Sequence, residues 1–331
     1  MLRLDRFMVL LGLAAVAPIL ACNSSDAQKT PPATSSSAAL ATAPPVTSSP
    51  PPAPGPTIAN RWGKSVGLKA PESVLLDDKN DVYLVSNVDG KPLDVDGKGF
   101  ISKLAPVGQG VELKWIDSGK NKVVLNAPKG MAITGDTLWV ADIDTVRTFH
   151  RTTGAPTGDI KIAGATFLND MAVTPDGRVL VSDTGFKPAK DGGLEASGSD
   201  AIYAIDKDRK PAPIARSKGL GRPNGIIPYG DQRMYVVSMG TGEMFTVDAS
   251  GNRDNGQKMP RGGLDGIAFG RDTYFISSWD ANAIYRGVVN HDFEVFIDDV
   301  KSPADLMFDR KRNRLLVPLM TEDEVRAYEV P

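Results

Sequence analysis

Hydrophobic and polar positions alternate in short runs from about residue 58 to the end of the chain. A seven-residue segment recurs six times, at 70–76, 127–133, 167–173, 222–228, 263–269 and 302–308. A turn, a second apolar run and a third apolar run follow each copy. Runs of this length, rich in β-branched residues and bounded by Gly, Asp and Asn, indicate strands. No long stretch has the periodicity of an amphipathic helix, so the pattern predicts an all-β fold.

The spacing of the repeats predicts a β-propeller with six four-stranded blades, because repeats of about 40 to 50 residues with successive short strands are typical of propeller blades. The third residues of the six segments are Glu72, Lys129, Asn169, Asn224, Asp265 and Ala304. The last unit ends after its third strand, whereas residues 57–63 precede the first unit. We therefore expect this N-terminal segment to supply the missing strand and to close the ring, which leaves no open sheet edge.

Two units are longer than the others because they carry insertions between their second and third strands. The insertions are residues 88–99 in the first unit and 184–200 in the third. Alternating strand direction places this connection on the face where the six aligned positions converge. Long Gly-rich loops on a rigid scaffold often carry function. We expect both loops to overhang the mouth of the central channel.

The N-terminal segment has a different character. Residues 1–21 have a basic start and an apolar run over 7–21, and they are followed by Cys22, the only cysteine. This layout resembles a bacterial lipoprotein signal peptide, and the run is short of the roughly 20 residues that span a bilayer. We expect lipid on Cys22, a disordered Pro/Ser/Ala/Thr-rich linker over 22–57, and the propeller over 58–331. The protein would then lie outside the cytoplasm, anchored to a membrane by its lipid, and to the outer membrane in a double-membraned cell.

Composition removes several classes of function. The chain has 38 Lys and Arg against 40 Asp and Glu, so no overall positive charge favours a nucleic-acid partner. A single cysteine excludes an intrachain disulfide. Only two histidines, His150 and His291, are available for a Ser-His-Asp triad or a His-rich zinc site. The composition favours no particular oligomeric state.

Oxygen-bearing side chains dominate the aligned positions. Glu72, Asn169, Asn224 and Asp265 occupy four of them, and two further acids, Asp170 and Asp305, each follow an aligned position. Carboxylate and amide oxygens suit a hard cation such as Ca²⁺ or Mg²⁺. The alternative is that the Asn-Gly, Asn-Asp and Asp-Gly pairs simply form turns.

The aligned motifs also carry a family resemblance. The order Pro-Glu-Ser, Asn-Asp, Pro-Asn-Gly and Leu-Asp-Gly over residues 65–331 resembles the gluconolactonase and regucalcin family of six-bladed propellers. The resemblance implies that Glu72, Asn224 and Asp265 ligate a divalent metal, Ca²⁺ first, with Mg²⁺, Mn²⁺ and Zn²⁺ as alternatives. It also implies that Asp265 is the general base and that Asn169 contacts substrate or metal-bound water. The family's typical Arg, two residues before that Asn, is Phe167 here.

Two functions follow from these residues. The first is a metal-dependent, lactonase-like hydrolase that acts on a small cyclic ester at the channel mouth. Lys129, Asp170 and Asp305 would help to bind its substrate, although Lys129 would instead be structural if it paired with Glu72 or an aspartate. The second is a non-catalytic lipoprotein that binds a ligand or a protein, since propellers host many functions. Phe167 and the lipid tether favour the second.

Overall fold

The computed structural model describes residues 55–331 except 231 and 255. The predicted signal peptide, Cys22 and nearly all of the predicted linker lie outside this range. No helix among the described residues is long and apolar enough to cross a membrane.

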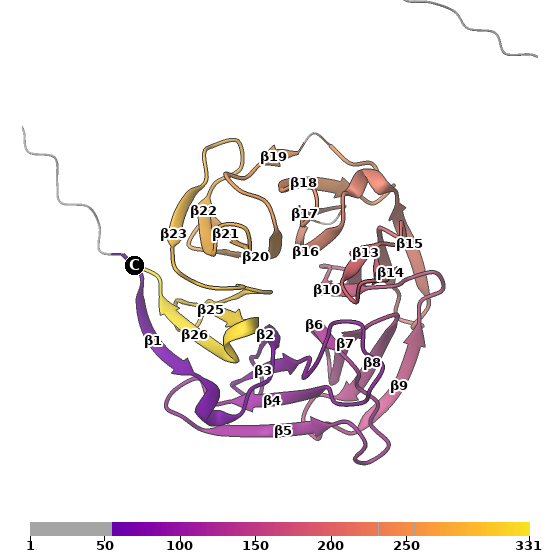
Figure 1. Cartoon of the computed structure of the whole chain (residues 1–331), viewed down its shortest axis with the longest axis vertical. Helices are drawn as coiled ribbons and strands as arrows, with labels where there is room; N and C mark the ends of the chain where they lie inside the picture. Colours follow the sequence, from indigo (N-terminus) through magenta and orange to yellow (C-terminus); the bar gives the residue numbers. More distant parts are fainter. Residues whose placement is uncertain (1–54, 231, 255) are drawn as a thin grey trace, which may run out of the picture. The chain divides into compact units, whose positions relative to one another are not determined.

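The described chain forms six four-stranded antiparallel sheets arranged as the blades of a propeller (Figure 1). The first blade comprises β2 (Pro71–Asp77), β3 (Val82–Asn87), β4 (Phe100–Leu104) and β5 (Val111–Asp117). The second comprises β6 (Pro128–Thr134), β7 (Thr137–Asp142), β8 (Thr145–His150) and β9 (Pro156–Lys161). The third comprises β10 (Leu168–Val173), β11 (Val179–Asp183), β14 (Ala201–Ile205) and β15 (Pro211–Arg216). In each of them the first strand is nearest the axis and the last is outermost.

The other three blades repeat this order. The fourth blade comprises β16 (Pro223–Tyr229), β17 (Arg233–Ser238), β18 (Glu243–Asp248) and β19 (Gln257–Lys258). The fifth comprises β20 (Leu264–Gly270), β21 (Thr273–Ser278), β22 (Ala283–Gly287) and β23 (Glu294–Ile297). The sixth comprises β24 (Met307–Asp309), β25 (Arg314–Leu319), β26 (Glu324–Glu329) and β1 (Thr57–Trp62). The described residues also contain three short 3-10 helices, η1 (Lys64–Val66), η2 (Lys218–Leu220) and η3 (Met320–Glu322). The predicted fold class is confirmed.

The N-terminal strand closes the ring, as the sequence predicts. β1 pairs antiparallel with β26, from Thr57 opposite Glu329 to Trp62 opposite Val325. The Trp62 side chain is fully buried, and its ring meets that of Tyr83 in the first blade at 5.9 Å between centroids. The closing strand therefore joins the last blade to the first by packing as well as by hydrogen bonds.

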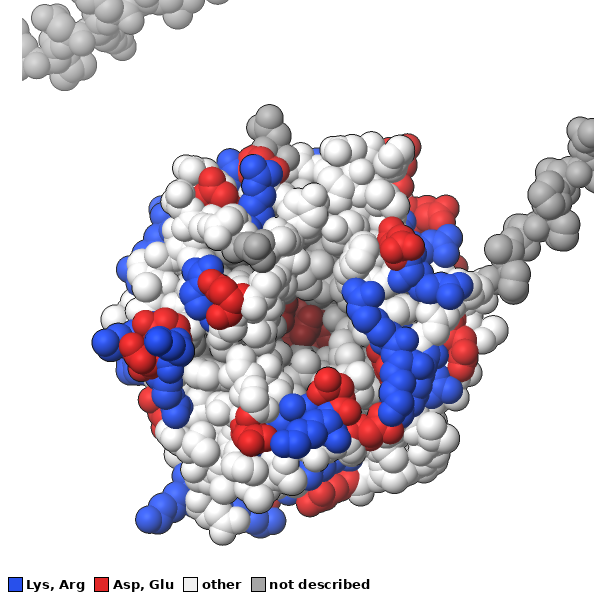
Figure 2. Space-filling view, turned by 180° about the vertical axis from the view of Figure 1, so that it is seen from behind, with Lys and Arg blue, Asp and Glu red and all other residues white. Residues whose placement is uncertain are grey.

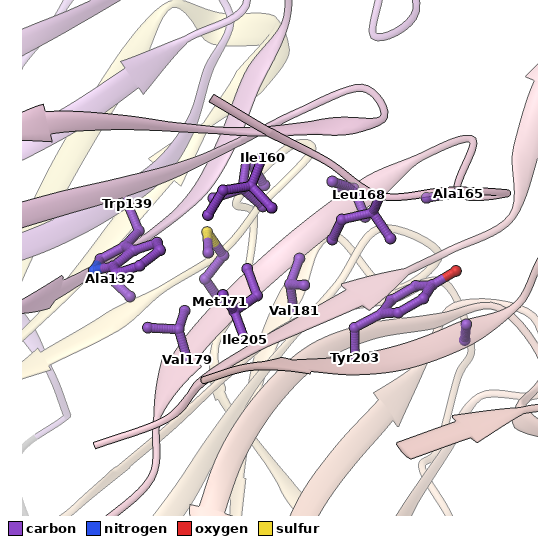
Figure 3. Packing of buried hydrophobic residues seen from close by; sticks show 14 residues of the cluster. Ala132, Trp139, Ile160, Ala165, Leu168, Met171, Val179, Val181, Tyr203 and Ile205 are labelled. Atoms are coloured by element: carbon purple, nitrogen blue, oxygen red, sulfur yellow. The ribbon is translucent and has the colours of Figure 1, made fainter. Parts of the chain in front are cut away.

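Packing between blades forms the core. Six apolar clusters occur among the described residues, each between two adjacent blades. Figure 3 shows the cluster between the second and third blades, where Trp139 and Ile160 face Met171, Val181 and Tyr203. Interdigitated apolar side chains hold neighbouring blades together along the whole ring.

Five of the six inner strands have an irregularity at the same place in the repeat. Pairing with the second strand shifts register between Pro71 and Val74, and at the equivalent positions of the next four blades. The two residues inside each shift, the third and fourth of the repeat, form a β-bulge, a device that redirects side chains near functional sites. The Asn-Gly, Asn-Asp and Asp-Gly pairs therefore lie within strands, and the interpretation of these pairs as turns is wrong.

The two insertions differ in structure. Residues 88–99 contain no strand, whereas the second insertion forms a short hairpin of β12 (Phe186–Pro188) and β13 (Leu194–Ala196). The hairpin is an addition that the sequence pattern does not reveal, because its strands are only three residues long.

Candidate active site at the channel mouth

Glycine at the fourth repeat position lets the inner strands approach closely. A Cβ atom on Gly225 would lie 2.6 Å from the Asp265 carbonyl oxygen, and one on Gly266 would lie 2.6 Å from the Leu306 nitrogen. Such distances exclude any side chain, so only glycine permits this approach. The close approach brings the side chains of the third repeat positions together around the axis.

A cavity of about 250 Å³ lies at the mouth. It is lined by four polar residues from the inner strands, Glu72, Lys129, Asn169 and Asp265, and by seven apolar residues, Pro92, Phe167, Phe186, Leu194, Met239, Trp279 and Met320. Pro92 belongs to the first insertion, and Phe186 and Leu194 belong to the hairpin. Both insertions therefore overhang the mouth, as expected.

Three side chains at third repeat positions have buried polar atoms without partners. They are Glu72 with Oε2, Asn224 with Oδ1 and Nδ2, and Asp265 with Oδ1. Buried polar atoms normally have hydrogen bonds, and leaving them unpaired costs free energy. These are the three predicted metal ligands, and their oxygens fit a hard divalent cation. The described residues contain no group of three or more His, Cys, Asp or Glu placed to hold a metal, so Asn224 would complete the set.

The acids of the channel repel one another. Burial raises the pKa of Glu72 well above its usual range, and the charges of Asp265 and Asp305 add to this while Lys129 opposes it. Burial, followed by the charge of Asp305, raises the pKa of Asp265 to about 8. Burial also raises the pKa of Asp305 to about 7. Ionising all of these carboxyls together would require a compensating positive charge.

Trp279 holds one oxygen of Asp265. Its Nε1 donates to Asp265 Oδ2 at 2.8 Å, which opposes the rise in pKa and leaves Oδ1 free. The Asn224 amide also opposes the rise, without completing a hydrogen bond of normal geometry. Trp279 is not one of the aligned repeat positions. Its position just after β21, at the mouth, is the signal that points to a role in the site.

Asn169 is oriented by a residue that the sequence analysis did not single out. Its Nδ2 donates to Thr184 Oγ1 at 2.9 Å, and Thr184 Oγ1 donates to the Pro223 carbonyl at 2.8 Å. This bond fixes the orientation of the amide, so the amide oxygen and the second N–H are the groups that Asn169 can offer to a ligand.

Lys129 is buried beside Phe167. Its side chain is 1% exposed, and Nζ donates to the carbonyls of Pro92 at 3.1 Å and Ala127 at 3.0 Å. Nζ also lies 4.4 Å from the centre of the Phe167 ring, a cation–π contact. Burial lowers the pKa of Lys129, and the charge of Glu72 opposes this. The ion pairs among the described residues do not include Lys129, so the salt bridge considered from sequence is not formed.

Asp170 and Asp305 point elsewhere. They line a second cavity, of about 210 Å³, which does not include Glu72 or Asp265. Asp170 Oδ2 accepts from the Ile226 nitrogen at 2.7 Å, and Asp305 Oδ2 accepts from Ser73 Oγ at 2.6 Å. Figure 2 shows acidic side chains in a hollow at the centre of the ring. These two acids tie adjacent blades together and act on the mouth through their charge; a direct role in substrate binding stays a prediction.

No protein-family model and no curated protein matches the sequence. Solved structures do match. A gluconolactonase from Xanthomonas campestris is 15% identical, covers 84% of this chain and 95% of its own, and has a TM-score of 0.62. The chain shares the fold of this enzyme.

Two further enzymes have the same fold. A luciferin-regenerating enzyme is 15% identical over 83% of this chain and 94% of its own, with a TM-score of 0.58. Virginiamycin B lyase from Staphylococcus aureus is 14% identical over 82% of this chain and 99% of its own, with a TM-score of 0.55. At these identities the likeness concerns the fold alone.

Proposed function

We propose that this protein is a metal-dependent hydrolase of small cyclic esters. The observation that carries the proposal is that Glu72, Asn224 and Asp265 have buried oxygens without partners. Glu72 and Asp265 line a cavity of small-molecule size, and the Asn224 amide lies next to Asp265. The presence of a gluconolactonase among the structural neighbours supports the same chemistry.

Glu72, Asn224 and Asp265 would hold a divalent cation, for which Ca²⁺ is the first choice because all three offer oxygen. When bound, the cation supplies polarisation of the ester carbonyl. Asp265 Oδ1 takes a proton from water as the water oxygen attacks the carbonyl carbon. The ring C–O bond then breaks, and the proton passes to the leaving alkoxide, which gives a hydroxy acid. Trp279 keeps Asp265 in place through Oδ2.

A lyase reaction is less well supported. The catalytically inactive form of virginiamycin B lyase carries alanine in place of a histidine. The two histidines of this chain, His150 and His291, do not line the mouth cavity. A base at the mouth would therefore be a carboxylate. Glu72 and Asp265 both line the cavity with an unpartnered oxygen, and we assign the base to Asp265, whose other oxygen is held by Trp279.

The test is a panel of lactones assayed after metal removal and separate addition of Ca²⁺, Mg²⁺, Mn²⁺ and Zn²⁺. Asp265→Asn should lower kcat/KM by about 100-fold or more, the range for loss of a general base. Asp208→Asn, in the exposed turn between β14 and β15, is the control and should leave turnover unchanged.

Metal binding is measured separately by the shift in Tm. A ligand at 100 times its Kd stabilises a protein by about 2.7 kcal/mol, so a bound cation should raise Tm measurably. A raised Tm without turnover of any lactone would contradict the hydrolase and favour the ligand-binding alternative. No shift with any of the four cations would contradict the metal site itself.

We also propose that the protein is held at a bacterial membrane by lipid on Cys22, since the first 22 residues have the layout of a lipoprotein signal. Cys22→Ser should move the protein from the membrane fraction to the soluble fraction of the cell envelope. An unchanged distribution would contradict the anchor.

A further inference from the structure

The walls of the mouth cavity differ from what a polyhydroxylated ligand needs. We infer that the substrate is a lactone carrying an apolar alkyl or aryl substituent, and not a sugar lactone. This inference rests on the proposed hydrolase and specifies the substrate class of the same site.

The composition of the wall is the first argument. Seven of the eleven lining residues are apolar. Three come from the insertions, three directly follow strands of the later blades, and Phe167 directly precedes β10. Met239, Trp279 and Met320 lie just after β17, β21 and β25, so the apolar wall extends over three consecutive blades. An apolar pocket with a few fixed polar groups selects ligands by their apolar area.

The second argument is that most polar groups of the cavity already have a partner or belong to the cation set. Lys129 donates to two backbone carbonyls, and the amide nitrogen of Asn169 donates to Thr184. Glu72 and Asp265 belong to the cation set. Few partners remain for the hydroxyls of a sugar ring. A hydroxyl buried without a partner weakens binding by about five- to 150-fold.

The aromatic pair shows where the substituent would lie. The rings of Phe167 and Phe186 meet edge to face at 5.4 Å between centroids, and the Arg222 guanidinium lies 5.2 Å from the centre of the Phe186 ring. Phe186 belongs to the hairpin, which also supplies Leu194 at the rim. Leu194 is 43% exposed, so an apolar chain that reached the rim would bury part of its side chain.

The size of the cavity limits the substituent. At about 250 Å³ it is slightly smaller than the roughly 300 to 1,000 Å³ of pockets for drug-sized ligands. A five- or six-membered ring with a short chain fits this volume, whereas a long acyl chain would have to pass over the rim at Leu194.

The experiment compares γ-butyrolactones that carry 5-alkyl chains from methyl to hexyl with glucono-1,5-lactone, using the Ca²⁺-loaded protein. We expect kcat/KM to rise about fourfold for each added methylene until the cavity is full, the ratio that burial of one CH₂ supplies. A kcat/KM that does not change with chain length, or a higher kcat/KM for gluconolactone, would overturn the inference but would not contradict the proposed hydrolase.

A binding measurement separates this inference from the catalytic proposal. 2-Alkylcyclopentanones have the same ring size and no ester bond to cleave, and their Kd can be followed by calorimetry. Their affinity should rise with chain length by the same factor. A rise in affinity without turnover of any lactone would support the ligand class and overturn the hydrolase. Affinity that does not depend on chain length would overturn the ligand class.

A matched pair of variants tests where the chain lies. Leu194→Asn replaces an aliphatic group at the rim by a polar group of similar size, and it should flatten the dependence of Kd on chain length. Val295→Thr makes the same kind of change on the outer strand β23, where the side chain is 55% exposed, and should leave the dependence unchanged. If the dependence of Kd on chain length stays unchanged in Leu194→Asn, as in Val295→Thr, the alkyl chain lies away from the hairpin and the assignment to this wall is overturned.

Discussion

At the scale of single residues, the channel brings four carboxyl groups together in a buried environment. Glu72, Asp170, Asp265 and Asp305 all have a raised pKa, with burial as the largest cause in each. In an unfolded chain the same carboxyls would titrate near 4. The metal-free native protein therefore binds more protons than the unfolded chain over several pH units.

The consequence is a stability that falls with rising pH. With metal removed by chelator, the free energy of unfolding should decrease from about pH 4 to about pH 8, because the native state gives up its extra protons over this range. Tm recorded against pH measures this. Asp305→Asn should reduce the part of the slope below about pH 7. A Tm that rises over the range would contradict the proton balance.

Phe167 and Lys129 form a second residue-scale unit. Phe167→Arg would restore the residue typical of the resembled family but would place a guanidinium beside a buried ammonium. We expect the variant to lose on the order of 3 kcal/mol of stability, as when a buried charge lacks its partner.

The double variant Phe167→Arg with Lys129→Met provides the test of this pair. It should recover most of the loss, since the repelling charge is gone, and a double-mutant cycle in denaturant gives the coupling energy. Phe167→Leu is the control for loss of the ring. Additive effects in the cycle would show that the two side chains do not interact.

The candidate ligands could be found from sequence because they occupy one position of a repeat. That Asp170 and Asp305 lie in a different cavity from Glu72 and Asp265 could not be predicted from sequence. It depends on the bulge, which sends the third repeat residue to the mouth cavity and the fourth to the other cavity or to the next blade. A bulge is set by pairing with the neighbouring strand, which local alternation does not record.

At the scale of elements, the fit of one inner strand against the next sets the geometry of the site. Gly225→Ala would place a methyl group 2.6 Å from the Asp265 carbonyl oxygen. Forcing β16 away from β20 should cost about 1 to 3 kcal/mol and should also weaken metal binding, since Asn224 and Asp265 would move apart.

Chemical denaturation and metal titration of this variant give the two values. Gly63→Ala is the matched control, because its nearest neighbour would be 3.7 Å away and its φ of −98° suits alanine. Equal losses in the two variants would show that the close approach has no structural role.

The elements themselves were predictable to different degrees. Three runs in each unit have clear apolar patterns that predict strands, and these runs form the three inner strands of each blade. The outer strand of the last blade, β1, was predicted, whereas those of the first five blades were not located. A strand such as β9 is almost wholly exposed, so its sequence resembles that of a polar loop. The hairpin at 184–200 was missed for a similar reason: only Phe186 of its six strand residues is buried.

At the scale of the whole molecule, ring closure should contribute much of the stability. Trp62→Ala would remove a fully buried side chain from the joint between the last and first blades, at a cost of about 3 to 5 kcal/mol. Ile58→Ala in the same strand is the control, since Ile58 is 44% exposed. Thermal unfolding of the full chain compares them, and similar Tm values would contradict a stabilising joint.

The hydrogen bond between Ser73 and Asp305 joins residues 232 positions apart. Contacts at such sequence separation form late and slowly, because the entropy of closing the chain must be paid before they contribute. The first blade is made early during synthesis, yet it cannot complete its contacts until the last strand has left the ribosome. A chain that stops before β26 would lack the partner of β1 and would retain an open edge. The mouth needs Glu72 from the first blade and Asp265 from the fifth. It would therefore form only when synthesis of the propeller is nearly complete.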